Sequence, residues 1–306
     1  MMVETKKWKR AASSGREDII SKLWFGEEKS AIVQIAHGMS EHVERYNAFA
    51  EYLTNYGFIV YMNEHAGHGE GADTLGFFAE KDGMEYVVSD MKSLHDEATK
   101  EFPGLPIFLL GHSMGSFLAR KYIAQYGDEL SGCILSGTSG SNPALGIGMT
   151  ISSIQKKVKG DKSVGKFLTG MAFGSYLKRI ENPVNSSAWI SRDDEVCKEY
   201  KKDKYCGFKF TAGGFYDLFT LLKEINKKDW PERVPKNLPI YLFSGAEDPV
   251  GSYGKGVEEV FENLKKTGHE DVTMKLYEGG RHEMLNELNK EEVYEDTLKW
   301  LQDHLK

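Results

Sequence analysis

The stretch Ile107-Phe108-Leu109-Leu110-Gly111-His112-Ser113-Met114-Gly115 decides the fold. Its first four residues form an apolar run that is typical of a buried strand, and a helical pattern follows at residues 117–122. Between them, Gly-x-Ser-x-Gly is the pattern of a sharp turn that lifts the serine hydroxyl away from the backbone. Side chains at positions 111 and 115 would collide with the neighbouring strand and helix. The stretch therefore predicts that Ser113 is an exposed nucleophile at the carboxyl edge of a sheet.

Apolar runs typical of strands recur along the rest of the chain, and helical patterns separate many of them. The strand-like runs are residues 31–36, 58–62, 107–110, 132–135, 239–243 and 273–277. The clearest helical patterns are residues 46–56, 84–101 and 291–305. Strands that alternate with helices favour an α/β fold, with a mostly parallel central sheet that helices flank on both faces.

Residues 140–234 interrupt this alternation, because they contain several helical patterns and no convincing strand. Pro231 and Pro235 mark the return to the sheet. We interpret this segment as a helical cap, or lid, that is inserted between two strands of the core. The predicted organisation is a core domain in two parts, residues 1–139 and 235–306, with the cap at residues 140–234.

A serine nucleophile needs a neighbouring base, and the base needs an acid that orients it. Behind an elbow of this kind the chain order is serine, then acid, then histidine. Asp248 follows the strand-like run at 239–243, and His282 follows the run at 273–277. Both positions lie at carboxyl ends of strands, where open α/β sheets place their chemistry. We predict a triad of Ser113, Asp248 and His282, in which Glu247 is the rival acid.

Acyl transfer also needs two donors for the oxyanion that forms on the substrate. One is the backbone N–H of the residue after the nucleophile, which is Met114 here. The other is expected from a turn that follows an earlier strand, and the backbone N–H of Met39 is the candidate. The same two turns supply candidate substrate-binding residues, which are His37, Gly38 and His112.

Several motifs carry a family resemblance. They are His37-Gly38-x-x-Glu41-His42, Arg45-Tyr46, His65-x-Gly67-His68-Gly69, Gly111-His112-Ser113-Met114-Gly115, Asp248-Pro249-Val250-Gly251 and Gly280-Arg281-His282-Glu283. With them the chain resembles the branch of the α/β-hydrolase superfamily that holds monoacylglycerol lipases and lysophospholipases, grouped by sequence with the serine aminopeptidases. The resemblance implies an α/β-hydrolase fold with a helical cap, and a Ser-His-Asp esterase whose oxyanion hole includes Met39 and Met114. Glu64 and Gly71 depart from the family, which usually has Asp and Ser there.

The cap carries the information about the substrate. Four of its aromatic residues, expected to line a cavity for an acyl chain, are Phe208, Phe210, Phe215 and Phe219. The alternative is that they pack the cap onto the core. Lysines at 156, 157 and 159 follow apolar residues, so transient contact of the cap with a membrane surface is a further hypothesis. The expected partner is a small ester or a single-chain lipid.

Two other functions remain open at this point. A peptidase or a thioesterase could use the same triad, and a peptidase would need acidic side chains to hold the substrate ammonium. Candidates for that role are Glu181, Asp193, Asp194 and Glu195. A non-catalytic ligand-binding protein on the same fold is the third reading, although an intact triad argues against it.

Composition limits the partners and the compartment. A net charge of −7 argues against nucleic acid, which requires a basic surface. No Cys and His spacing is typical of a zinc site, so no metal and no cofactor are expected. The first 16 residues carry basic side chains without an apolar run behind them, which is unlike a secretory signal. Three cysteines, an odd number, favour a reducing cytoplasm.

Overall fold

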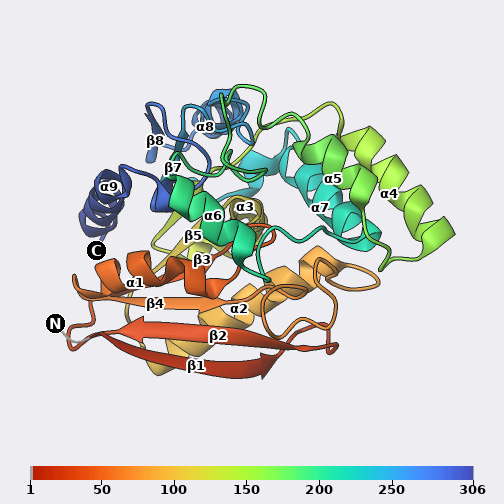
Figure 1. Ribbon diagram of the computed structural model, residues 1–306. Helices are drawn as coiled ribbons and strands as arrows, with labels where there is room; N and C mark the ends of the chain where they lie inside the picture. Colours follow the sequence, from red (N-terminus) through yellow and green to blue (C-terminus); the bar gives the residue numbers. More distant parts are fainter. Residues whose placement is uncertain (1–2, 306) are drawn as a thin grey trace.

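A single eight-stranded sheet forms the centre of the computed structural model, which describes residues 3–305 (Figure 1). The strands run in the order β1-β2-β4-β3-β5-β6-β7-β8. Their bounds are β1 (Glu4–Ala11), β2 (Asp18–Phe25), β3 (Ala31–Ala36), β4 (Phe58–Asn63), β5 (Ile107–His112), β6 (Gly132–Ser136), β7 (Ile240–Gly245) and β8 (Val272–Tyr277). The six strands β4, β3, β5, β6, β7 and β8 are parallel to one another. Strand β2 pairs antiparallel with β4, and β1 pairs antiparallel with β2 at the edge of the sheet. The predicted α/β fold and its mostly parallel sheet are confirmed.

Helices cover both faces of the sheet. On one face, α1 (Asn47–Thr54) and α9 (Lys290–Asp303) bury their apolar sides against β3, β4 and β5. On the other face lie α2 (Gly83–Glu101), α3 (Met114–Tyr126) and α8 (Lys255–Lys266). Because both faces are covered, β3 to β7 are buried along their whole length, which explains their continuous apolar sequences.

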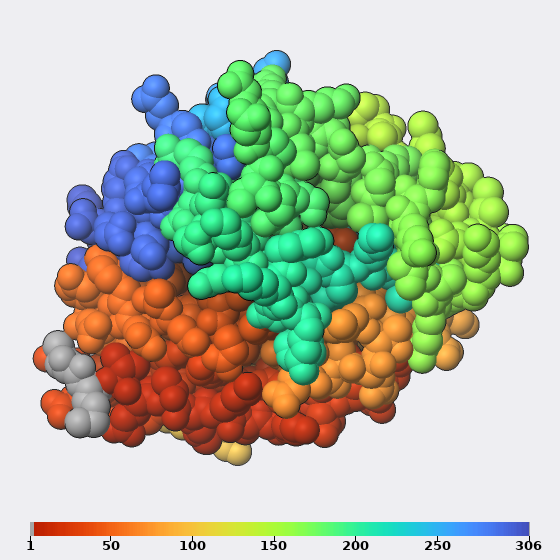
Figure 2. Space-filling view, viewed as in Figure 1, coloured from red at the N-terminus to blue at the C-terminus, as the bar shows by residue number. Residues whose placement is uncertain are grey.

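The remaining helices come mostly from the segment between β6 and β7. They are α4 (Leu145–Lys159), α5 (Lys166–Phe173), α6 (Asp194–Lys202) and α7 (Ala212–Ile225). Figure 1 shows α4 and α5 at the end of the molecule far from α9, and Figure 2 shows green and teal residues of this segment over the orange residues near the start of the chain. Short 3-10 helices complete the fold at Val43–Tyr46 (η1), Gly127–Glu129 (η2), Trp230–Arg233 (η3) and Met284–Asn286 (η4).

Helix α7 differs from the other helices of this segment, because it belongs to the main hydrophobic core. Phe215, Leu218 and Ile225 are buried in the same apolar cluster as side chains of α2 and α3. It also packs against α4. Helix α7 therefore anchors the outer helices to the core. Within residues 3–305, no helix combines the length and the apolarity that crossing a membrane would require.

Candidate active site

Ser113 lies in the turn between β5 and α3 with a backbone φ of 53°, a left-handed value that side chains rarely adopt. The turn is tight enough that a Cβ at Gly111 would overlap the backbone of Gly115, and a Cβ at Gly115 would overlap the carbonyl of Ala36. Ser113 N–H donates to the carbonyl of Ser136 at 2.9 Å, which fixes the turn against β6. The strained turn predicted from the glycines is therefore present, and it presents the serine at the carboxyl end of β5.

His282 and Asp248 meet at the same edge of the sheet. Nδ1 of His282 donates to Oδ2 of Asp248 at 2.9 Å, since an ionised carboxylate can only accept. The hydroxyl of Ser244 and the backbone N–H of Val250 also donate to this carboxylate, each at 2.8 Å. Asp248 is fully buried, so these bonds leave its side chain one orientation.

Glu247, the rival acid, is placed differently. Its side chain is half exposed, and its carboxylate lies 3.9 Å from Arg179. The fold therefore brings Asp248, and not Glu247, to His282.

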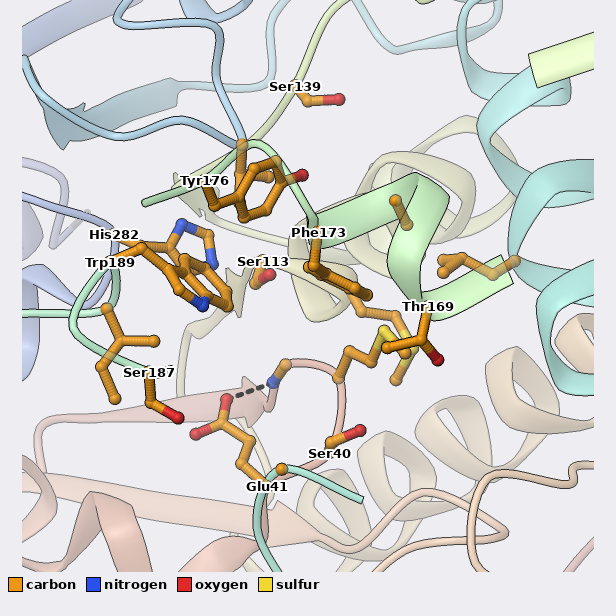
Figure 3. A pocket seen from close by; sticks show the side chains of 18 of the residues that line it. Ser40, Glu41, Ser113, Ser139, Thr169, Phe173, Tyr176, Ser187, Trp189 and His282 are labelled. Carbon is orange, nitrogen blue, oxygen red and sulfur yellow. Dashed lines mark hydrogen bonds between the residues drawn. The ribbon is translucent and has the colours of Figure 1, made fainter. Parts of the chain in front are cut away.

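The imidazole of His282 is ready to accept a proton. With Nδ1–H committed to Asp248, Nε2 carries the lone pair, and among residues 3–305 it has no hydrogen-bond partner. Burial lowers the pKa of His282, but the charge of Asp248 and its hydrogen bond outweigh that effect, so the pKa lies above its ordinary value of 6.5. Figure 3 shows His282 and Ser113 facing the same cavity, whose wall includes both residues.

The predicted oxyanion donors lie beside Ser113. Met114 begins α3, so its N–H is one of the amides at the open end of that helix. Met39 follows β3, and no hydrogen bond among the described residues uses its N–H. Both side chains line the cavity, and a Cβ at Gly38 would come within 3.1 Å of the Ser113 Cβ. This close approach brings the turn after β3 against Ser113.

Ser40 holds this turn in place through four hydrogen bonds. Its backbone is also left-handed, with φ of 56°. Its N–H donates to Nε2 of His68 at 3.2 Å, and its hydroxyl donates to the carbonyl of Phe208 at 2.8 Å. Its carbonyl accepts from the N–H of Gly207 at 2.9 Å and from the hydroxyl of Tyr200 at 3.0 Å. This turn after β3, which carries the predicted oxyanion donor Met39 and is the oxyanion turn of the site, is therefore tied directly to the segment around α6.

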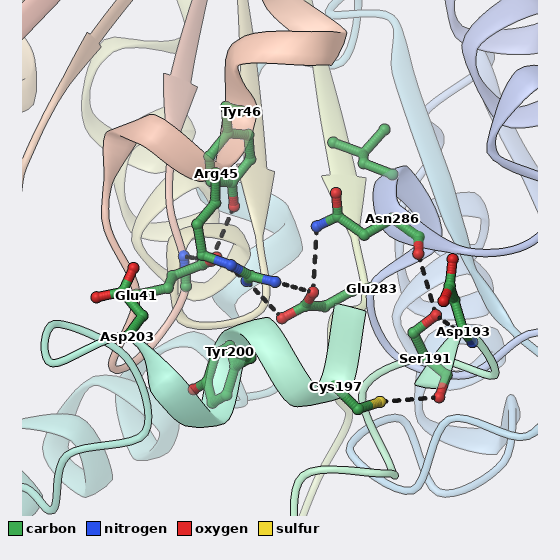
Figure 4. Close-up of polar contacts among 12 residues, drawn as sticks. Glu41, Arg45, Tyr46, Ser191, Asp193, Cys197, Tyr200, Asp203, Glu283 and Asn286 are labelled. Carbon is green, nitrogen blue, oxygen red and sulfur yellow. Dashed lines mark hydrogen bonds and ion pairs between the residues drawn. The ribbon is translucent and has the colours of Figure 1, made fainter. Parts of the chain in front are cut away.

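A buried polar network joins the oxyanion turn to the segment that carries His282 (Figure 4). The carboxylate of Glu41 accepts from the N–H of Gly38 at 2.5 Å and from Arg45 at 2.7 Å. Arg45 then binds both oxygens of Glu283 at 2.6 Å. Glu283 directly follows His282, so one guanidinium links the two halves of the site. The sequence motifs contain these three residues, but reasoning from the residues assigned them no role.

The candidate substrate-binding residues divide into two groups. Gly38 and His112 line the cavity. His37 does not, because it is buried behind the turn, where its ring packs against His65 and His68. Burial holds the pKa of His37 well below its usual range, and its Nε2 accepts from the N–H of His65 at 3.0 Å. His37 therefore supports the turn and does not face substrate.

The cavity has a volume of about 650 Å³, and most of the residues that line it belong to the segment between β6 and β7. Of the four predicted phenylalanines, Phe208 and Phe219 line it. Phe210 and Phe215 are fully buried and belong to the main hydrophobic core, Phe210 just before α7 and Phe215 within it.

The wall also contains aromatic residues that sequence reasoning missed, among them Phe173, Tyr176 and Trp189. The Trp189 ring lies 5.1 Å from that of His282 and contacts the other two (Figure 3).

Comparison with known proteins agrees with this geometry. Residues 27–289 match the family described as serine aminopeptidase, S33. The chain is 30% identical over 311 residues to a monoacylglycerol lipase of Mycolicibacterium smegmatis, with 100% of each chain covered. It is 27% identical over 278 residues to the human monoglyceride lipase, covering 89% of this chain and 82% of that protein.

Solved structures point the same way. A thermostable carboxyl esterase from Bacillus coagulans, solved in complex with glycerol, superposes with a TM-score of 0.93 at 31% identity and 99% coverage of both chains. The family match covers most of the chain, and the similarity to lipases and esterases extends over its full length. The chain therefore belongs to the serine aminopeptidase S33 family of α/β-hydrolases, in the branch of the monoacylglycerol lipases, and it is a carboxylic-ester hydrolase.

Proposed function

We propose that the enzyme hydrolyses monoacylglycerols and similar single-chain esters through an acyl-enzyme formed on Ser113. The observation that carries the proposal is the cavity of about 650 Å³ that opens at Ser113 and His282 and has an apolar outer wall. Its volume suits one acyl chain with a small alcohol. Each methylene buried there contributes about 0.8 kcal/mol, so chain length has a direct effect on binding.

The mechanism moves one proton back and forth. Nε2 of His282 takes the proton of the Ser113 hydroxyl as its oxygen attacks the ester carbonyl. The N–H groups of Met39 and Met114 stabilise the oxyanion. His282 then gives the proton to the departing alcohol, which leaves the acyl group on Ser113. Water attacks this acyl-enzyme by the same route, and the fatty acid leaves as the proton returns to Ser113. Asp248 keeps Nδ1 protonated throughout.

The peptidase alternative lacks support from the cavity. Glu181, Asp193, Asp194 and Glu195, the acids proposed to hold an ammonium, are absent from the wall among residues 3–305. The two carboxylates that do line the cavity belong to Glu41 and Glu283, and both are already paired with Arg45. A thioesterase activity would use the same acyl-enzyme, and the substrate panel below separates it. A purely binding role does not explain a histidine poised to accept a proton.

The cap as a unit, residues 140–234, is part of the proposal. It supplies the wall residues Phe173, Trp189 and Phe208, while the core supplies the catalytic groups. An insertion at this place lies over the carboxyl edge of the sheet and selects the acyl group without taking part in the chemistry.

Transient contact of this cap with a lipid surface is a further component. Ile147, Ile154 and Val158 lie on one side of α4, because they are seven and four residues apart, and all are exposed. Phe167 of α5 is 67% exposed. Lys157 is also exposed, so the surface combines apolar and cationic side chains, as interfacial helices do. Ile154→Glu should reduce sedimentation with anionic phospholipid vesicles, whereas Tyr56→Glu, a change at an exposed apolar residue next to α1, should not.

The activity is tested with a fluorophosphonate probe and a substrate panel. The probe should label Ser113, and Ser113→Ala should lose both the label and the ester turnover. Ser187→Ala, which removes another hydroxyl of the cavity wall, should keep the label. The panel compares monoacylglycerols of graded chain length, lysophospholipids, acyl thioesters, an acetate ester and aminoacyl amides. Highest kcat/KM for aminoacyl amides, or turnover by Ser113→Ala close to the wild type, would refute the proposal.

A further inference from the structure

Three potential metal ligands meet where the oxyanion turn contacts the cap. A nitrogen of His42, a carboxylate oxygen of Asp203 and the sulfur of Cys206 all lie within 4.8 Å of one another. His42 follows the turn that carries Met39 and Ser40, whereas Asp203 and Cys206 lie in the loop after α6. His42 and Cys206 are each 8% exposed. Residues 161 positions apart along the chain thus form one compact group.

The protein holds this group in a defined geometry. Nε2 of His42 donates to Asp203 Oδ2 at 2.7 Å, and the other oxygen of Asp203 accepts from the N–H of Tyr205 at 2.8 Å. The N–H of Cys206 donates to the carbonyl of Asp203 at 3.1 Å.

One cation lies near the group and does not prevent metal binding. Burial raises the pKa of the Cys206 thiol, although the guanidinium of Arg45 opposes this shift in part. The charge of Arg45 is itself balanced by Glu41 and Glu283, with which it makes short ion pairs. His42, Asp203 and Cys206 therefore still offer a nitrogen, an oxygen and a sulfur atom to a divalent cation.

We propose that His42, Asp203 and Cys206 bind a thiophilic divalent cation of the zinc type, and that this cation inhibits the enzyme. A thiolate, an imidazole and a carboxylate are the ligands that zinc prefers, whereas magnesium and calcium require oxygen ligands. On binding, the thiol of Cys206 loses its proton to solvent. The ring proton of His42 moves from Nε2 to Nδ1, which leaves Nε2 free for the metal. A water molecule would complete the tetrahedron.

Inhibition follows from the position of the site. Ligand atoms of a tetrahedral zinc site lie about 3.5 Å apart, whereas Nε2 of His42 and Oδ2 of Asp203 lie 2.7 Å apart, so a cation between them would push these two atoms apart by roughly 0.8 Å. Cys206 and its neighbour Phe208 line the cavity, and Phe208 holds Ser40 of the oxyanion turn. A displacement of about 1 Å at a catalytic site costs on the order of 10²-fold in rate. The cation would therefore slow ester turnover without touching the triad.

Cobalt(II) is the direct probe, because its thiolate complexes absorb in the near ultraviolet. Titration of the full-length enzyme should give a charge-transfer band that saturates at one equivalent, and zinc should displace it. Cys206→Ser should abolish the band, and His42→Gln should weaken cobalt binding at least tenfold. Cys197→Ser changes another buried cysteine and should leave the band intact. His95→Gln should also leave it intact, because His95, Asp96 and Glu129 form a second cluster without a thiol.

Turnover supplies the second measurement. Zinc should lower kcat/KM of the wild type at least tenfold and EDTA should restore it, whereas Cys206→Ser should be insensitive to zinc. Asp203→Asn changes a partly exposed side chain and should weaken zinc binding at least tenfold. This variant tests the site if Cys206→Ser does not fold. Absence of a thiolate band, or its persistence in Cys206→Ser, would overturn the site. Binding that leaves turnover unchanged would overturn the inhibition.

Discussion

Asp248 and Glu247 are neighbours in sequence, but the fold gives them different surroundings. Asp248 is buried and receives hydrogen bonds from Ser244, Val250 and His282. Glu247 is half exposed. We expect Asp248→Asn to lower kcat about 10⁴-fold, because an amide that donates to Nδ1 favours the wrong imidazole tautomer. Glu247→Gln should change kcat less than about threefold, the scale of surface substitutions. Steady-state kinetics with one soluble ester measures both, and the reverse ranking would exclude Asp248 as the orienting acid.

The pKa of His282 sets the acid limb of the pH profile. Catalysis requires the neutral imidazole, so kcat/KM falls as the pH drops through this pKa. The carboxylate of Asp248 raises the pKa above 6.5 despite burial, so the midpoint of the limb should lie above pH 6.5. A profile measured from about pH 5 to about pH 9 with a neutral ester tests this. A midpoint at or below pH 6.5 would show that the pair does not couple as the geometry indicates.

At this scale the sequence predicts the residues that belong to local patterns. Gly-x-Ser-x-Gly identifies Ser113 because the turn needs its glycines, and chain order then restricts the acid and the base. Trp189 was not predicted as a cavity residue, because its segment has neither helical nor strand periodicity. Its contact with His282 depends on how the cap folds over the core. His37 shows the opposite case, in which a motif residue turned out to support the turn from behind.

Elements differ in how well their sequences identify them. The parallel strands β3 to β7 are continuous apolar runs, because helices cover both of their faces, and all were predicted. Strand β1 was missed. It is an edge strand with mostly exposed side chains, and its sequence Glu-Thr-Lys-Lys-Trp-Lys-Arg-Ala has the charged character that protects sheet edges. Its partner β2 was also missed, because Ser21 and Lys22 interrupt the apolar residues of that strand.

The loop after β4 holds Glu64 where the family usually has Asp. Its carboxyl is buried and fills space that Gly69 leaves open, since a Cβ there would overlap it. A Cβ at Gly71 would overlap the carbonyl of Asp18, which explains why serine is absent. The longer acid and the missing side chains therefore fit one another, and burial raises the pKa of Glu64 to about 7, although the charge of Lys7 opposes this.

This pKa predicts how stability depends on pH. The folded-state pKa of Glu64 lies above the ordinary value of 4.5, so folding favours the protonated form, and its stabilising contribution is lost as the pH rises toward and through 7. Glu64→Gln is neutral at every pH. We expect the variant to gain roughly 3 kcal/mol in free energy of unfolding relative to the wild type between about pH 5 and about pH 8. Urea unfolding of both proteins at the two pH values measures this gain. An equal difference at both would mean that Glu64 stays ionised.

At the scale of the whole molecule, the sheet supplies the proposed catalytic residues, and the segment between β6 and β7 supplies most of the cavity wall. The sheet edge carries Ser113, Asp248 and His282 at the ends of β5, β7 and β8. The cap segment supplies the outer wall and also holds the oxyanion turn through Ser40. Substrate choice and catalytic geometry are therefore coupled through the same contacts. Sequence periodicity located the segment, but the arrangement of its helices over the cavity depends on long-range packing that periodicity does not contain.

Phe219 and Phe215 lie on the same helix, and changing each of them tests whether the cavity wall selects the acyl chain. Phe219 lines the cavity, whereas Phe215 is fully buried in the core and its ring stacks on that of Phe219. Phe219→Ala should lower kcat/KM for long-chain monoacylglycerols by about tenfold or more while acetate hydrolysis changes little, because only the long chain reaches the lost contacts. Phe215→Ala should destabilise the fold by roughly 3–5 kcal/mol and keep the ratio between the two substrates. Equal losses for both substrates in Phe219→Ala would mean that the acyl chain binds elsewhere, and the wall from α7 would then be structural alone.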